Sequence, residues 1–181
     1  MDKDRSRLLM QKHLILCGGE ERRRIGIARE VLSSFSDPKP LLFHILPGLH
    51  TFDDYLNMVR QIFPIFSPLG LPKTKMTLDQ IWDMHLDWVE KDPEPKIIFW
   101  EEICLEQGEY LAEILNDYVT WAYILNEISP PDKHPWFRLL ATSPVSLINL
   151  CCEAKFFIGR GEEDTRTNED IWKQYLVIED I

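Results

Sequence analysis

The first segment that could do chemistry is the turn after the apolar residues 13–17. It opens with Gly18 and Gly19 and closes with the basic residues 22–24. A glycine-rich turn between a strand and a helix can bind phosphate, because its backbone N–H groups surround the phosphate oxygens and a nearby cation neutralises their charge. The turn therefore predicts a nucleotide site, with Gly18, Gly19, Arg23 and Arg24 as candidate residues.

The residues of this turn depart from a working phosphate loop, which reads G-x-x-x-x-G-K-[ST]. Arg23 replaces the second glycine, Arg24 replaces the lysine, and Ile25 replaces the hydroxyl that holds Mg²⁺. Glu20 and Glu21 add carboxylates where phosphate oxygens would lie. The turn therefore favours a degenerate site with no catalytic residue and no required cofactor, and it leaves weak ATP or ADP binding open. A structural loop with a charged rim is the simpler alternative.

Two later turns carry the other candidate residues. Glu101 and Glu102 follow the strand-like segment 96–100, and Thr142 is the last residue of the strand-like segment 137–142. In nucleotide hydrolases one carboxylate at such a position holds Mg²⁺ and the next polarises the attacking water, while a polar residue after the neighbouring strand senses the γ-phosphate. The simpler interpretations are an exposed glutamate pair and a serine–threonine turn before Pro144.

The chain alternates strand-like and helix-like segments. This alternation predicts a three-layer α/β domain with a mostly parallel five-stranded sheet and helices on both faces. The carboxyl ends of such strands meet at one edge, where ligands bind, so the candidate turns should lie together. The expected strands are residues 13–17, 41–46, 96–100, 137–142 and 155–159, and the expected helices are residues 25–35, 51–62, 77–89 and 109–128, with Thr51 as an N-cap.

Composition limits the function classes. The 181 residues are 45% hydrophobic and suit one domain, which we assign to residues 1–160. A solvated acidic end should follow at 161–181, with one amphipathic segment near Ile171 and Trp172. The net charge of −10 argues against direct binding to nucleic acid or an anionic membrane. There is no apolar run of membrane-spanning length and no signal-type segment. The cysteine and histidine spacings predict no metal site, and a reduced, cytoplasmic protein.

The order of the motifs resembles the AAA+ ATPase domain of clamp-loader subunits, above all the delta-prime type of bacterial DNA polymerase III. The resemblance spans residues 12–158 and implies a P-loop NTPase-like AAA+ core. The motifs that carry it are the opening strand and loop at 12–19 (KHLILCGG), a Walker B strand at 97–102 (IIFWEE), an L-x-E-x-P-P turn at 125–131 (LNEISPP), and a sensor-1 strand at 137–144 (FRLLATSP).

The departures from this family shape the expected function. The phosphate loop is degenerate, the family's S-R-C trio falls near residues 150–152 without an arginine, and the lid and collar of a full subunit are missing. Subunits of this type often lack ATPase activity. The resemblance therefore implies a non-catalytic pseudo-ATPase that acts through protein–protein contacts. Its partners would be other AAA+ replication subunits in a hetero-oligomer, and it would reach DNA only indirectly.

Two other functions stay open. Residues 18–23 loosely resemble the G-G-x-G-x-R loop of nucleotidyltransferases, although Glu21 stands where that loop needs a small residue. A nucleotide-using transferase or NTPase would then use the 18–24 loop. The other possibility is a scaffold with no nucleotide link.

Overall fold

The computed structural model describes residues 3–36, 39–62, 94–104, 108–123, 137–150 and 168–181. Its centre is a five-stranded sheet in which all neighbouring strands are parallel, in the order β2-β3-β4-β1-β5. This arrangement confirms the α/β fold class predicted from the alternating pattern. The strands are β1 (His13–Cys17), β2 (Leu41–Ile45), β3 (Lys96–Trp100), β4 (Phe137–Ser143) and β5 (Leu176–Asp180).

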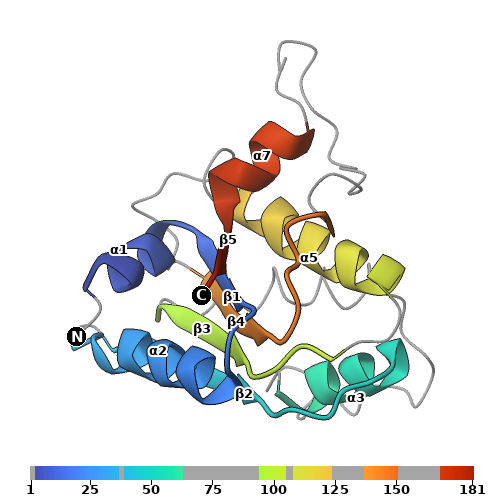
Figure 1. Cartoon of the computed structure of the whole chain (residues 1–181), viewed down its shortest axis with the longest axis horizontal. Helices are drawn as coiled ribbons and strands as arrows, with labels where there is room; N and C mark the ends of the chain where they lie inside the picture. The colour runs from blue at the N-terminus through green and yellow to red at the C-terminus, as the bar shows by residue number, and fades with distance from the viewer. Residues whose placement is uncertain (1–2, 37–38, 63–93, 105–107, 124–136, 151–167) are drawn as a thin grey trace.

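Helices cover both faces of the sheet and make three layers (Figure 1). Successive side chains of a strand point to opposite faces. One face is covered by α1 (Lys3–Gln11) and α2 (Glu21–Ser33), and the other by α3 (Phe52–Ile62), α5 (Gly108–Tyr123) and α7 (Asn168–Tyr175). Leu14 and Leu16 of β1 accordingly pack with α1 and α2, while Ile15 and Cys17 pack on the opposite face. No helix in these parts of the chain is long and apolar enough to cross a membrane.

The C-terminal segment is part of this domain, so the prediction of a solvated end was wrong for residues 168–181. Strand β5 pairs in parallel with β1 along its whole length. Ile171 and Trp172 of α7 are fully buried, and the indole Nε1 of Trp172 donates to Asn116 Oδ1 at 3.2 Å. The acidic residues misled the prediction because one of them, Glu179, is neutralised by an ion pair with Arg5 of α1.

The other predicted elements agree with the structure to within a few residues, with two differences. Helix α1 was not predicted, since only its Leu8, Leu9 and Met10 are apolar. Helix α2 begins at Glu21 rather than Ile25, because the Glu20 carbonyl accepts hydrogen bonds from the N–H groups at 23 and 24. The basic residues 22–24 thus lie in the first turn of a helix. The expected helix 77–89, the strand 155–159, the turn 125–131 and residues 151–152 lie outside the described residues.

The N-terminus of α3 has the predicted cap. Thr51 Oγ1 accepts a hydrogen bond from Asp54 N at 3.1 Å and donates one to Asp54 Oδ2 at 2.8 Å, while Thr51 N donates to the same carboxylate at 3.0 Å. We expect Thr51→Ala to lower the free energy of unfolding by about 1 kcal/mol, measured by urea denaturation. Thr51→Ser keeps the hydroxyl and should stay near wild type; an equal loss in both variants would contradict the cap.

Candidate functional site

Sheet topology brings the turns after β1, β3 and β4 together. Because β4 lies between β1 and β3, the carboxyl ends of these three strands are neighbours. Gly18 N donates to the Ser143 carbonyl at 3.1 Å, and Ile103 N donates to the Thr142 carbonyl at 2.8 Å. The loops therefore meet at the edge where ligands bind in parallel α/β sheets.

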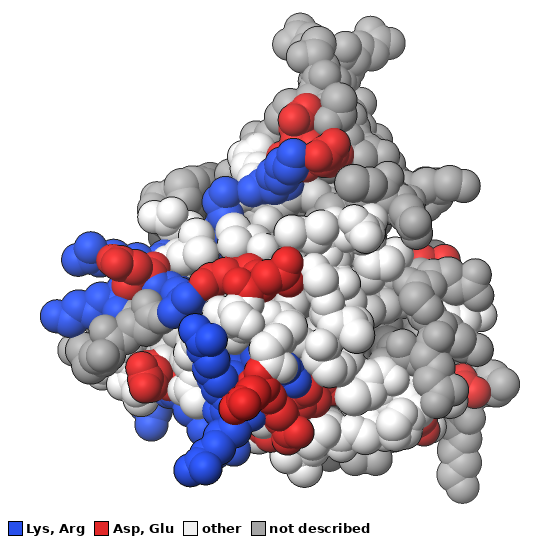
Figure 2. Space-filling model, viewed as in Figure 1, with Lys and Arg blue, Asp and Glu red and all other residues white. Residues whose placement is uncertain are grey.

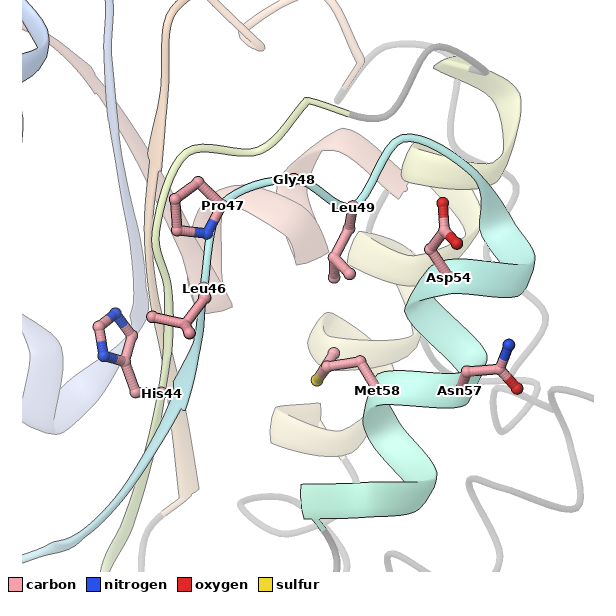
Figure 3. A pocket seen from close by; sticks show the side chains of 8 residues that line it. All are labelled: His44, Leu46, Pro47, Gly48, Leu49, Asp54, Asn57 and Met58. Atoms are coloured by element: carbon pink, nitrogen blue, oxygen red, sulfur yellow. The ribbon is translucent and has the colours of Figure 1, made fainter.

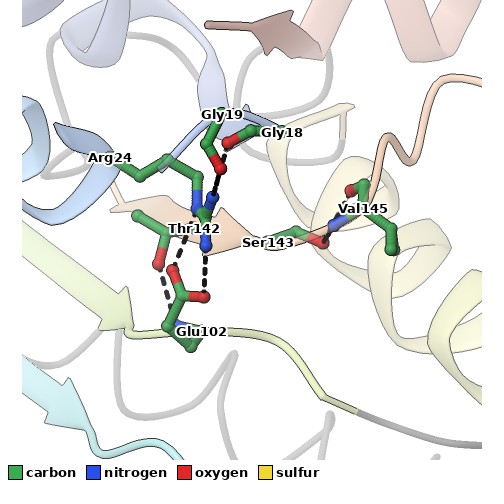
Figure 4. A network of polar contacts seen from close by, with 7 residues as sticks. All are labelled: Gly18, Gly19, Arg24, Glu102, Thr142, Ser143 and Val145. Atoms are coloured by element: carbon green, nitrogen blue, oxygen red, sulfur yellow. Dashed lines mark hydrogen bonds and ion pairs between the residues drawn. The ribbon is translucent and has the colours of Figure 1, made fainter. Parts of the chain in front are cut away.

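The side chain of Arg24 fills the space between these turns (Figure 4). Its Nε donates to Glu102 Oε1 at 3.1 Å and its Nη2 donates to Glu102 Oε2 at 2.7 Å. Only 3% of the Arg24 side chain and 9% of the Glu102 side chain are exposed. This is a bidentate ion pair, the strongest pairing that an arginine and a carboxylate make, and it is shielded from water. The hydrogen bonds that Arg24 donates to Glu102 raise the pKa of the guanidinium above its usual value.

The same guanidinium also binds the glycine loop. Arg24 Nη1 donates to the carbonyl oxygens of Gly18 at 2.5 Å and Gly19 at 2.6 Å. In a phosphate loop the backbone N–H groups point at the ligand and favour an anion. Here the carbonyls of residues 18 and 19 point inward and accept hydrogen bonds from the Arg24 guanidinium, which is a cation. A phosphate entering this space would meet carbonyl and carboxylate oxygens, so the loop has the opposite polarity to the one predicted.

Glu102 holds its place through an unusual backbone conformation. Its φ is +53°, a region that non-glycine residues seldom adopt. The Thr142 hydroxyl accepts the Glu102 N–H at 2.8 Å, and Arg24 holds the carboxylate. Strain of this kind persists only where the surroundings fix it. Arg24 and Thr142 together supply that restraint, which links all three turns.

The structure gathers most of the predicted site residues but not all. Gly18, Gly19, Arg24, Glu102 and Thr142 lie in one connected network (Figure 4).

Glu101 and Arg23 lie outside this network. Glu101 Oε2 is 2.7 Å from His44 Nε2 on β2, and Arg23 is exposed in the first turn of α2. The contact of His44 was not predicted. The parallel register that pairs His44 with Phe99, two positions before Glu101, is the signal that could have found it. Ser143 makes the simpler serine–threonine turn, accepting from Val145 N at 3.3 Å.

The turn at residues 47–49 does not join the network. Pro47, Gly48 and Leu49 instead line an open hollow of about 400 Å³ between the end of β2 and α3 (Figure 3). Asp54 and Met58 of α3 line its other side. This hollow lies at the same edge of the sheet as the Arg24 network.

The thiols and acids of the described residues offer no further chemistry. Burial raises the pKa of Cys17 to about 11 and also raises the pKa of Cys104, so both thiols stay protonated at neutral pH. No group of three histidines, cysteines or carboxylates in the described ranges could hold a metal ion.

Gly19 is required by the fold of the loop. Its φ is +59°, and a Cβ placed there would lie 2.3 Å from the Ile181 carbonyl oxygen, which follows β5. Gly18 has a similar φ of +69° but open space around it.

We therefore expect Gly18→Ala to cost about 1–2 kcal/mol from backbone strain alone. Gly19→Ala should cost at least about 1 kcal/mol more, because the added methyl must also displace Ile181. Denaturant unfolding of both variants tests this difference, and equal losses would mean that Ile181 does not restrict the loop.

Comparisons with known proteins identify the fold. No protein-family model and no curated protein matches the chain. Among solved structures it is similar to Cdc6p from Pyrobaculum aerophilum, with a TM-score of 0.58 and 9% sequence identity over 98% of this chain. The chain spans 45% of the length of that protein. At this identity the likeness concerns the fold alone, and it agrees with the three-layer, P-loop NTPase-like α/β fold that the sequence predicted.

Proposed function

We propose that this AAA+-like protein is a non-catalytic subunit of a DNA replication assembly of the clamp-loader type, and that it acts through protein–protein contacts. The fold relation to Cdc6p, an AAA+ replication initiator, and the ordered clamp-loader motifs both support a role in replication. The observation that carries the non-catalytic part is the Arg24 guanidinium, bonded to Glu102 and to the loop carbonyls.

Each group that ATP hydrolysis needs is absent or engaged. Ile25 stands where a hydroxyl would hold Mg²⁺. The Glu102 carboxylate, at the position that would polarise water, is paired with Arg24. The Glu101 carboxylate is bonded to His44. Admitting ATP would require breaking a buried ion pair and presenting carbonyl oxygens to phosphate, so the unliganded form is the stable one.

The surface supports contact with proteins rather than with DNA. Figure 2 shows charged side chains of both signs over α1 and α2, beside a broad uncharged area on the same face. Exposed apolar side chains occur in the loops at the carboxyl edge of the sheet, where Leu46 is 65% exposed, Val145 60% and Ile148 50%. With a net charge of −10, the protein would reach DNA only through its partners.

Two measurements test the proposal. Calorimetric titration with ATP and ADP in the presence of Mg²⁺ should give no saturable binding, and affinity capture with purified AAA+ clamp-loader subunits of the same organism should recover a complex. ATP turnover that is abolished by Glu102→Gln would overturn the non-catalytic part. Failure to bind any of those subunits would overturn the clamp-loader part. Saturable nucleotide binding that depends on Arg23 would favour the transferase instead.

A further inference from the structure

Strand β2 is the outermost strand of the sheet on the β3 side, and no other described strand pairs with its outer edge. Leu41 N donates to the Pro95 carbonyl at 2.7 Å, and the Ile45 carbonyl accepts from Glu101 N at 2.9 Å. Odd-numbered residues of β2 therefore turn their backbone groups toward β3, and Leu42 and His44 turn theirs outward. Within the described residues, β2 pairs only with β3 and no hydrogen bond reaches the outward backbone groups at 42 and 44.

Between Pro40 and Pro47, strand β2 lacks the features that normally block pairing. Proteins protect exposed edge strands with lysine or other charged side chains, with proline, or with a bulge. Residues 41–46 contain no Lys, Arg, Asp, Glu or Pro. Their leucines are unusually exposed, with Leu41 at 38%, Leu42 at 47% and Leu46 at 65%. An apolar, regular edge of this kind is suited to adding another strand.

We propose that β2 pairs antiparallel with β2 of a second copy of this chain, across a two-fold axis at Phe43. Such pairing sets Leu42 of each copy opposite His44 of the other. Both residues direct their backbone outward, and an opposed pair of this kind exchanges two N–H···O bonds. The Leu42–His44 pairing is the same in both directions across the two-fold axis, as an isologous interface requires. The two five-stranded sheets would then form one continuous sheet.

Charge complementarity supports a second copy as the occupant. In this register Lys39 of one copy lies opposite Pro47 of the other. Pro47 lines the same hollow as Asp54, an exposed carboxylate, and Met58 (Figure 3). Lys39 is exposed and has no ion pair within the described residues. Its aliphatic stem can cover the apolar wall of the hollow while its ammonium group approaches Asp54, and the two-fold axis makes this contact twice.

This inference does not rest on the proposed function. Strands β3 and β4 separate β2 from β1 and the loop that Arg24 fills. A dimer could therefore form whether or not that loop binds nucleotide, and each proposal can fail without the other.

Sedimentation equilibrium of the full chain over a concentration series tests the dimer. Wild type should show a concentration-dependent mass that approaches two chains. Leu42→Lys should raise the dissociation constant by about 100-fold, since it replaces an apolar side chain at the interface of each copy with a charge. Leu42→Pro removes the outward N–H together with the leucine side chain and leaves the β3 ladder intact, and should raise the constant by at least about tenfold.

Matched variants distinguish this edge from other surfaces. Met10 on α1 is 47% exposed, the same as Leu42, so Met10→Lys adds the same charge elsewhere and should leave the dimer intact. Lys39→Glu should raise the dissociation constant by about tenfold, because it sets like charges together twice. Circular dichroism confirms that each variant is folded.

A single-chain mass at every concentration would overturn the proposal. A dimer that tolerates both changes at Leu42, or that Met10→Lys disrupts equally, would overturn it as well.

Discussion

Arg24→Met is expected to lower the free energy of unfolding by about 3–5 kcal/mol, because it leaves the Glu102 carboxylate buried without its partner. The side chain of Glu102 is only 9% exposed, so water cannot replace the guanidinium fully. The variant also removes the donors to the carbonyls of Gly18 and Gly19. Equilibrium denaturation in urea at neutral pH measures the loss.

Two controls separate the ion pair from a general effect of losing an arginine. Arg23 is one residue earlier in the same helical turn and is exposed, so Arg23→Met should change stability by less than about 0.5 kcal/mol. Arg24→Met combined with Glu102→Leu removes both charges and should recover much of the loss, since apolar replacement of a buried pair is often close to neutral. If the double variant were no more stable than Arg24→Met, the cost would come from packing and not from the uncompensated carboxylate.

The ion pair also explains how this loop is stable without a ligand. In a phosphate loop the inward N–H groups need an anion to satisfy them. Here the inward groups are carbonyls, and an arginine of the same chain satisfies them. The loop, the end of β3 and the end of β4 are thereby joined by Arg24, Glu102 and Thr142. A site fixed in this way can serve as a rigid part of a larger assembly.

The local pattern of the sequence predicted the positions of the site residues but not their roles. Apolar runs ended by glycine, glutamate or threonine located the three turns, and parallel topology brought Gly18, Glu102 and Thr142 together as expected. The role of Arg24 was not predictable from spacing, because its partner lies 78 residues away and the pairing depends on which strands are neighbours. Which glutamate faces the loop depends on the positive φ of Glu102, and composition does not show that.

Strand β5 shows a second limit of local pattern. Its residues, LVIED, end in two acidic side chains, which is typical of a solvated segment. The strand forms because β1 offers a full-length parallel edge and because Arg5 from α1 pairs with Glu179. Both contacts are long-range, so they become visible only when the fold is known.

The buried contacts of His13 on β1 make stability depend on pH. The ring is completely buried. Leu139 N donates to Nδ1 at 2.9 Å, so the ring proton sits on Nε2, which donates to the Tyr118 carbonyl at 2.7 Å. Burial, with the nearby Arg138 cation, lowers the pKa of His13 to about 3. The folded protein therefore keeps this imidazole neutral at any pH above that value.

The unfolded chain binds a proton at His13 below its usual pKa of about 6.5, whereas the folded protein does not bind it until about pH 3. The unfolded state thus holds more protons in this interval, so stability falls as the pH falls, by up to about 1.4 kcal/mol per pH unit from this group. We expect the wild type to lose stability between pH 6.5 and 5, above the range where most carboxylates titrate.

Urea denaturation at several pH values between 7 and 5, with two variants, tests the assignment. His13→Gln removes the titrating group and should flatten the pH dependence. The variant should be less stable at neutral pH, because the Leu139 N–H and the Tyr118 carbonyl lose the hydrogen bonds that the imidazole makes with them. His44 lies on β2 with a side chain that is 38% exposed, in contrast to the fully buried His13. His44→Gln is therefore the matched control and should retain most of the slope. A wild-type slope that persists unchanged in His13→Gln would mean that another group carries the proton, and that the buried ring is not what makes the fold sensitive to acid.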